Sequence, residues 1–223
     1  MSAFLGHIHF WLYKKIQLIN EREQLILKEA EKSLDDLATE LHDTAVSMYG
    51  EPIPADRNLQ MIIDHSNIHG WLQNQIEVTS VREATFIKDL LDCGGDMATD
   101  AILTAFVTQG TACGTLAKEK LGDAQHTPQE VYQAMQDYYL NGMPCDGGDT
   151  IISESDSEYI WAGTHQNQRE HWKKAGVSEV FMAAAYQAWF RAFVAAAAPY
   201  LQFDVILEEN NAPLYRISKT VAN

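Results

Sequence analysis

The chain has 223 residues, of which 46% are hydrophobic and 21% charged, and its formal net charge is −15. This composition is typical of a globular protein, and its acidity argues against nucleic acid and membranes as partners, because both carry negative charge. No run approaches the roughly 20 apolar residues of a membrane span, and the N-terminus lacks a secretory signal pattern.

The three cysteines, Cys93, Cys113 and Cys145, are far apart and form no C-x-x-C pair. Scattered cysteines in an odd number are typical of reduced thiols, so we expect a cytoplasmic protein. Cys93 and Cys113 are expected to be packed and Cys145 to be exposed in a loop. No neighbour of Cys145 supplies a base that would activate it as a nucleophile.

The first half of the chain is predicted to be helical. Apolar residues recur every three or four positions from Ser2 to Tyr49, which predicts one long helix. A second helix is predicted from about Arg57 to Leu91, with a break at Cys93-Gly94-Gly95-Asp96, and a third from Met97 to Leu121. Helices of this length often pack against a partner chain, so we predict a homodimer paired through the N-terminal helices.

The third helix contains Gly110 and Gly114, four positions apart. Glycine inside a helix costs about 1 kcal/mol relative to alanine. We therefore expect another backbone or a ligand to pass close to these two residues.

The second half of the chain alternates helices and short strands. Thr127 and Pro128 begin a fourth helix, which is expected to end near Gly142. A pair of strands, a polar loop at 163–176, a fifth helix and a second pair of strands follow. The second pair of strands is joined by a turn at 209–213. The predicted strands are 150–153, 158–161, 201–208 and 214–219, and the predicted helix is 178–197.

This order predicts an α+β fold, in which a long N-terminal helical hairpin precedes helices packed on a small antiparallel sheet. We place a helical extension at residues 1–96 and an α+β small-molecule-binding domain at 97–223.

From about Thr99 onward, the order of elements resembles the vinyl-reductase-type ligand-binding domain and the related aminothiazoline-carboxylate hydrolase family. The matching pieces are 108–114, 128–142, 150–163, 184–190 and 203–217. The resemblance implies a ligand pocket between the helices and the sheet. Members of these families often carry a cysteine after a Gly-Asp turn in the closing hairpin. Here that turn is Asn210-Asn211-Ala212-Pro213, followed by Leu214, so the cysteine chemistry does not carry over.

Aromatic and histidine side chains gather after the second predicted strand. Such loop positions often hold ligands, and these residue types offer aromatic walls and acid–base groups. The alternative is a solvated loop whose tryptophans are part of the core. The predicted ligand-binding residues are Trp161, His165, His171, Trp172 and Tyr186.

His65 and His69 are four positions apart, so on a helix both imidazoles lie on one face and can bind one metal ion. In an antiparallel hairpin about Pro52 to Pro54, His42 falls nearly opposite His65. These three histidines form a candidate zinc or iron site. The alternative is a set of hydrogen-bonded interface histidines. A second candidate, His7 and His9, can bind metal jointly only outside a helix.

The sequence thus leaves two main hypotheses and does not decide whether the protein is an enzyme. The first is a sensor-like protein that binds a small molecule in an apolar, aromatic-lined pocket. Whether this protein also contains a metal is left open. The second is a metal-dependent hydrolase of a small substrate that uses His42, His65 and His69. A purely structural helical protein is a third alternative.

Overall fold

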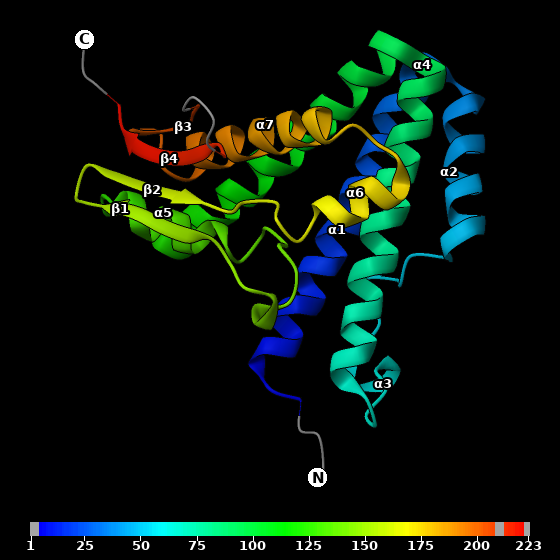
Figure 1. Ribbon diagram of the computed structural model, residues 1–223, viewed down its shortest axis with the longest axis horizontal. Coiled ribbons are helices and arrows are strands. Elements are labelled where there is room, and N and C mark those ends of the chain that lie inside the picture. Colours follow the sequence, from blue (N-terminus) through cyan, green and yellow to red (C-terminus); the bar gives the residue numbers. More distant parts are fainter. Residues whose placement is uncertain (1–4, 208–211, 221–223) are drawn as a thin grey trace. The chain divides into compact units, whose positions relative to one another are not determined.

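The computed structural model describes residues 5–207 and 212–220. The predicted α+β class is confirmed: the long N-terminal helices α1 and α4 precede helices packed on a four-stranded antiparallel sheet (Figure 1). The chain divides into two compact units. Unit 1 comprises Met1–Ala105 and Asn167–Met182, and unit 2 comprises Phe106–Gln166 and Ala183–Asn223. The predicted boundary at residue 96 stays a prediction.

The described part of unit 1 is built of helices. They are α1 (His7–Leu34), α2 (Asp36–Tyr49), α3 (Leu59–Ile62), α6 (Arg169–Ala175) and the first part of α4 (Ile68–Leu121). Buried apolar residues of α1 recur with helical spacing, as Leu12, Ile16, Ile19 and Ile26 do.

The prediction of one unbroken helix from Ser2 to Tyr49 is wrong in its continuity, and Ser2 lies outside the described residues. The helix breaks at Asp35, whose φ of 49° and ψ of −135° are not helical. The Asp35 N–H donates to the Glu31 carbonyl oxygen and closes α1, and α2 begins one residue later. These angles lie outside the left-handed helical region that aspartate adopts most readily, so the backbone is strained at this break.

The second predicted helix begins later than the sequence indicates. Ile63 is extended, and the Asp64 carboxylate accepts a hydrogen bond from the Ser66 N–H at 2.8 Å, which makes a turn before α4. The predicted break near Gly95 is confirmed as a kink, since Gly95 has a φ of 52° and a ψ of −126° inside α4.

Unit 2 contains the sheet, whose strands follow the order β1-β2-β4-β3 with antiparallel neighbours. A β-bulge interrupts the pairing of β1 with β2 between Ile151 and Ser153. The elements of this unit, besides the end of α4, are α5 (Pro128–Met135), the short 3₁₀ helix η1 (Pro144–Asp146), β1 (Thr150–Glu154), β2 (Glu158–Ala162), most of α7 (Glu179–Ala197), β3 (Leu201–Ile206) and β4 (Leu214–Lys219).

One face of the sheet is apolar and buried, because alternate residues of a strand point to the same side. Tyr159, Trp161, Phe203, Tyr215 and Ile217 lie on it. Helices α5 and α7 contribute aromatic side chains to this face, and α5 packs beside β2 and β4. The other face is polar; on it Arg216 lies 3.3 Å from the Asp204 carboxylate.

The expectation that a backbone passes close to Gly110 and Gly114 is confirmed. A Cβ atom built on Gly110 would lie 2.5 Å from the Trp189 carbonyl oxygen, and one on Gly114 would lie 2.3 Å from that of Phe193. Helices α4 and α7 therefore pack backbone to backbone in unit 2.

Two other predicted elements differ from the structure. The fourth helix ends at Met135 and not near Gly142, because the chain turns where the Tyr138 N–H donates to the Met135 carbonyl oxygen. The predicted loop 163–176 contains α6, a helix too short for its periodicity to be recognised. Residues 209–211 of the predicted closing turn lie outside the described residues.

By length and composition, α7 is the one helix of the described chain that could cross a membrane. Core helices of soluble proteins meet the same criterion, and Trp189, Phe190 and Phe193 of α7 are buried.

Candidate functional site

Three of the predicted ligand-binding residues come together in unit 2. The His165 ring lies 5.0 Å from that of Tyr186, and the Trp161 ring stacks 6.0 Å from that of Tyr215, all between ring centroids. Phe190 joins the two groups, since it contacts His165 and Tyr215. These residues form the centre of a buried aromatic cluster on the inner face of the sheet.

His165 is held in one orientation by Tyr139. The His165 backbone N–H donates to the Tyr139 hydroxyl at 3.2 Å, and that hydroxyl lies 2.8 Å from His165 Nδ1. The Tyr139 hydroxyl thus contacts both the backbone N–H and the Nδ1 atom of His165 and fixes the orientation of the ring. Burial raises the pKa of Tyr139 well above its ordinary value, so this hydroxyl stays protonated.

A half-buried carboxylate lies at the edge of the cluster. Asp149 Oδ2 accepts hydrogen bonds from Tyr132 on α5 at 2.9 Å and from Gln136, the residue that follows α5, at 3.4 Å. Asp149 Oδ1 accepts from Thr164 at 3.3 Å and Asn141 at 3.5 Å. No ion pair to Asp149 occurs among the described residues, and burial raises its pKa. Neutral donors thus fix this carboxylate between α5 and the sheet.

The aromatic cluster itself is closely packed. Trp161, Tyr186 and Tyr215 are almost fully buried, and Trp161 Nε1 donates to Thr164 Oγ1 at 2.6 Å. The hollows found in the described part of unit 2 are lined by other residues. The cluster therefore acts as a core, and the aromatic-lined pocket expected from the sequence stays a prediction.

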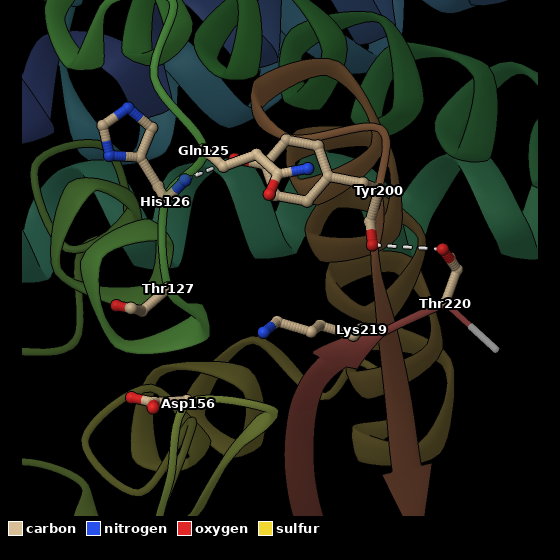
Figure 2. A pocket seen from close by; sticks show the side chains of 7 residues that line it. All are labelled: Gln125, His126, Thr127, Asp156, Tyr200, Lys219 and Thr220. Atoms are coloured by element: carbon tan, nitrogen blue, oxygen red, sulfur yellow. Dashed lines mark hydrogen bonds between the residues drawn. The ribbon is translucent and has the colours of Figure 1, made fainter. Parts of the chain in front are cut away.

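The main hollow of unit 2 lies at the opposite end of β2 from His165. It has a volume of about 530 Å³, within the range of roughly 300–1,000 Å³ common for ligand sites. Four separate segments line it, and we call it the strand-end hollow (Figure 2). Its lining residues are Gln125, His126, Thr127, Asp156, Tyr200, Lys219 and Thr220.

Hydrogen bonds tie the walls of the strand-end hollow together. The His126 backbone N–H donates to the Tyr200 hydroxyl at 2.6 Å, and Thr220 Oγ1 donates to the Tyr200 carbonyl oxygen at 3.1 Å. Figure 2 shows the Lys219 side chain extending into the space beside Asp156. Among the described residues, Lys219 forms no ion pair. Its ammonium group is therefore available to an anionic ligand.

His171 and Trp172 lie on α6 in unit 1, not in the aromatic cluster. Trp172 is buried, whereas His171 lines a surface hollow of about 540 Å³ together with Glu77, Glu170 and Lys174. Burial lowers the pKa of His171, which favours the neutral ring. The ion pair between Lys174 and Glu77 joins α6 to α4 beside it.

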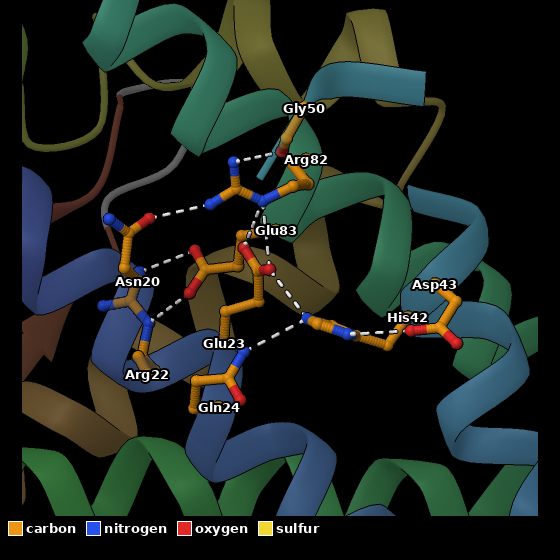
Figure 3. Close-up of polar contacts among 9 residues, drawn as sticks. All are labelled: Asn20, Arg22, Glu23, Gln24, His42, Asp43, Gly50, Arg82 and Glu83. Carbon is orange, nitrogen blue, oxygen red and sulfur yellow. Dashed lines mark hydrogen bonds and ion pairs between the residues drawn. The ribbon is translucent and has the colours of Figure 1, made fainter. Parts of the chain in front are cut away.

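His42 belongs to a buried polar network between α1, α2 and α4 (Figure 3). His42 Nε2 donates to the Glu23 carboxylate at 2.9 Å, and Arg82 Nε lies 3.0 Å from the same carboxylate. Arg82 also donates to Asn20 at 2.7 Å and to the Gly50 carbonyl oxygen at 3.1 Å. These contacts use the hydrogen-bonding capacity of His42 for packing.

A second ion pair completes this network. Both Nε and Nη2 of Arg22 donate to the Glu83 carboxylate at 2.7 Å, a bidentate arrangement. The two arginines and the two glutamates balance in charge, which lowers the cost of burying them.

The structure does not bring the predicted metal ligands together. His65 is exposed and bonds to the Gln60 carbonyl oxygen at 2.8 Å. The His69 ring lies 5.8 Å from that of His9, whose Nδ1 accepts from the Gly6 N–H. No group of three or more His, Cys, Asp or Glu side chains in the described ranges is arranged to hold a metal ion. The predicted zinc or iron site thus finds no support here and stays a prediction.

All three cysteines are free. Cys113 is buried and Cys145 exposed, as expected, whereas Cys93 is exposed and the expectation that it is packed is wrong. Cys93 lies two residues before the kink at Gly95, where α4 changes direction.

Sequence reasoning missed Asp149 and the strand-end hollow. Asp149 follows two glycines ahead of a strand, and Tyr132 and Gln136 are four positions apart at the end of α5, which is a weak signal. The lining of the hollow comes from four segments that are distant in the sequence, so no local pattern predicts it.

Comparisons of the chain with protein-family models, with curated proteins and with solved structures found no match. The similarity to vinyl-reductase-type domains therefore rests on the order of elements and stays a prediction.

Proposed function

We propose that this protein binds a small polar molecule with an anionic group, and that its role is sensor-like binding. The observation that carries this proposal is the strand-end hollow, into which the Lys219 ammonium group extends. This ammonium group forms no ion pair with a carboxylate of the described residues. An ammonium placed in a recess attracts carboxylate or phosphate groups from a ligand. The Gln125 amide, the Tyr200 hydroxyl and Asp156 offer further hydrogen bonds that can orient such a ligand.

A binding role is favoured over catalysis by the side chains of the hollow. A nucleophile or general base needs a partner within hydrogen-bond reach that activates it. Among the described residues, His126, Asp156 and Lys219 make no side-chain hydrogen bond to one another. The Glu130 carboxylate, 3.6 Å from His126 Nδ1, is not part of the lining of the hollow. The aromatic cluster and Asp149 have a structural role in this proposal, because they hold strands β2 and β4 in place in unit 2.

Thermal unfolding with a panel of small anions tests the proposal. The probes are inorganic phosphate, citrate, malonate and glutamate. A ligand at 100 times its dissociation constant stabilises the folded state by about 2.7 kcal/mol, which for a chain of this size raises Tm by about 5–10 °C. We expect Lys219→Met to abolish the shift given by the anion that binds.

Lys28→Met is the matched control, because Lys28 is an exposed lysine on α1 in unit 1. It should leave the shift unchanged. A shift that survives Lys219→Met, or no shift with any probe at 10 mM, would contradict binding at this site.

The alternative of a metal-dependent hydrolase using His42, His65 and His69 stays a prediction. Elemental analysis of purified protein checks it: near one zinc or iron per chain, lost in His65→Ala, would revive it. Protein without metal, and with unchanged stability in chelator, would end it.

A further inference from the structure

Two side chains of opposite charge face the strand-end hollow without pairing. Asp156 lies in the turn between β1 and β2, and Lys219 is the last residue of β4. Figure 2 shows both side chains beside the same open space. No ion pair joins these two described residues. The hollow therefore presents both a cation and an anion to a ligand that enters it.

Backbone contacts fix the positions from which these two side chains extend. The Lys219 backbone N–H donates to the Ser157 carbonyl oxygen at 3.0 Å, which ties the end of β4 to the turn. Within the turn, Ser155 Oγ accepts from the Ser157 N–H at 3.3 Å and from the Glu158 N–H at 3.1 Å. Serine hydroxyls often stabilise turns in this way. The fold itself thus brings the two charges to one hollow.

Two neutral groups of the lining can complete the hydrogen bonds of a ligand. The Tyr200 hydroxyl accepts from the His126 backbone N–H at 2.6 Å, so its own proton is left for an acceptor such as a carboxylate. The Gln125 amide makes no hydrogen bond among the described residues and offers both a donor and an acceptor. A carboxylate and an ammonium group can therefore both find neutral partners beside the charged ones.

The charge of the surrounding chain selects against ligands with several negative charges. Residues 121–168 contain eight aspartates and glutamates and no lysine or arginine, and the whole chain has a net charge of −15. Four of the seven lining residues of the hollow belong to this stretch. A ligand with two or three negative charges is repelled by this field, whereas a ligand whose charges sum to zero is not. A molecule with one positive and one negative group suits both the field and the two charged side chains.

We propose that the strand-end hollow binds a free α-amino acid, whose carboxylate pairs with Lys219 and whose ammonium group pairs with Asp156. Binding of this kind rests on the proposed function, because it uses the same hollow and the same lysine, and it adds the chemical class of the ligand. A free amino acid carries both charged groups on one carbon atom, whereas each end of a peptide carries only one of them. Peptides and simple carboxylates should therefore bind less tightly.

Isothermal titration calorimetry with matched pairs of ligands tests the proposal. The amino acids are alanine, leucine and glutamate, and their partners without the amino group are propionate, isocaproate and glutarate. We expect at least one amino acid to bind about 5- to 20-fold more tightly than its partner, because the partner lacks the charge-assisted hydrogen bond to Asp156. Alaninamide and leucinamide, which lack the carboxylate, should also bind more weakly than alanine and leucine.

Asp156→Asn separates the roles of the two charges. It keeps the size of the side chain and should weaken binding of the amino acid about 5- to 20-fold, while the partner without the amino group binds as before or more tightly. Glu154→Gln is the matched control, because it removes the same charge from the same hairpin at an exposed position outside the lining. This control should leave the affinity for the amino acid unchanged.

Equal affinity for each amino acid and its partner, or amino-acid binding that Asp156→Asn leaves unchanged, would overturn the proposal. So would the absence of binding by all three amino acids. In each of these cases, binding of malonate, phosphate or glutarate that depends on Lys219 would leave the proposed function standing. If no anion binds either, both proposals fail.

Discussion

At the scale of single residues, the stability of unit 1 depends most on its buried charged side chains. Glu23, Arg82, Arg22 and Glu83 are nearly inaccessible to water. Each charge depends on its partner, because an unpaired charge at such a site lacks both water and a counterion. The network joins α1 to α4 and, through His42, to α2.

We expect Arg82→Met to lower the free energy of unfolding by about 3–5 kcal/mol, because it leaves Glu23 buried without its main cation. Urea unfolding followed by circular dichroism measures the loss. The double variant Glu23→Gln with Arg82→Met should recover part of it, since no unpaired charge is left. A loss below about 1 kcal/mol in the single variant would show that water reaches the site.

His171 should make stability depend on pH. Burial lowers its pKa in the folded state, so the unfolded chain takes up the proton first as pH falls. The stability that the neutral His171 ring contributes is fully present above the pKa of about 6.5 that histidine has in the unfolded chain. It is lost as pH falls through the lower pKa of His171 in the folded protein. Glu77 and Glu170 oppose this effect, and Lys174 adds to it.

We therefore expect His171→Asn to flatten the fall in unfolding free energy between about pH 7 and pH 5. Urea titrations at several pH values measure it. His65→Asn, at an exposed position, should leave the curve as it is. If unfolding free energy falls equally steeply with pH in the His171→Asn variant and in the unchanged chain, the His171 ring is hydrated in solution.

At the scale of elements, the packing of α4 on α7 depends on glycine. Alanine is the better helix former by about 1 kcal/mol, but a Cβ on Gly114 would lie 2.3 Å from the Phe193 carbonyl oxygen. The neighbouring atoms are the Phe193 backbone and the Ala196 Cβ, and neither can rotate away. Overpacking should therefore outweigh helix propensity here.

Gly114→Ala is expected to destabilise the protein by about 1–3 kcal/mol net of the gain in propensity. Thermal unfolding measures the change. Thr115→Ala, at an exposed position on the same helix, should be neutral or slightly stabilising. A stable Gly114→Ala protein would mean that α4 and α7 can separate without loss.

The elements that could be predicted are those whose ends are marked by capping or turn residues. Thr127 and Pro128 marked the start of α5, and polar turns between short runs of β-branched and aromatic residues marked the strands. The break at Asp35 could not be predicted, because the apolar spacing continues across it and neither glycine nor proline is present. Tertiary contacts decide that backbone conformation.

The candidate site was predictable only in part. Trp161, His165 and Tyr186 do meet, because aromatic residues on a strand and a neighbouring helix share one buried face. The spacing of His65 and His69 said nothing about His42, whose partner Glu23 lies on another helix. Lys219 offered no signal, since an isolated lysine at a strand end is common on any surface.

At the scale of the whole molecule, the net charge of −15 opposes compactness. Self-repulsion of this kind is screened by salt, since the Debye length falls from about 30 Å at 0.01 M to about 8 Å at 0.15 M. Exposed ion pairs such as Arg216 with Asp204 weaken in salt, but each contributes only about 0–1 kcal/mol. Repulsion should therefore dominate.

Raising NaCl from 10 to 150 mM should raise Tm by a few degrees, and KCl at equal ionic strength should have the same effect. Differential scanning calorimetry measures both. A fall in Tm, or a response to only one of the two cations, would indicate that specific ion contacts outweigh the net charge.

The bulge in β1 has a consequence for how this protein behaves at high concentration. β1 is an outermost strand, and its isoleucines at 151 and 152 are exposed, a combination that favours aggregation through strand addition. The extra residue bends the strand and disturbs the regular spacing of its outer N–H and C=O groups. Deleting Ile152 would straighten that border and leave an open template on which fibrils could grow.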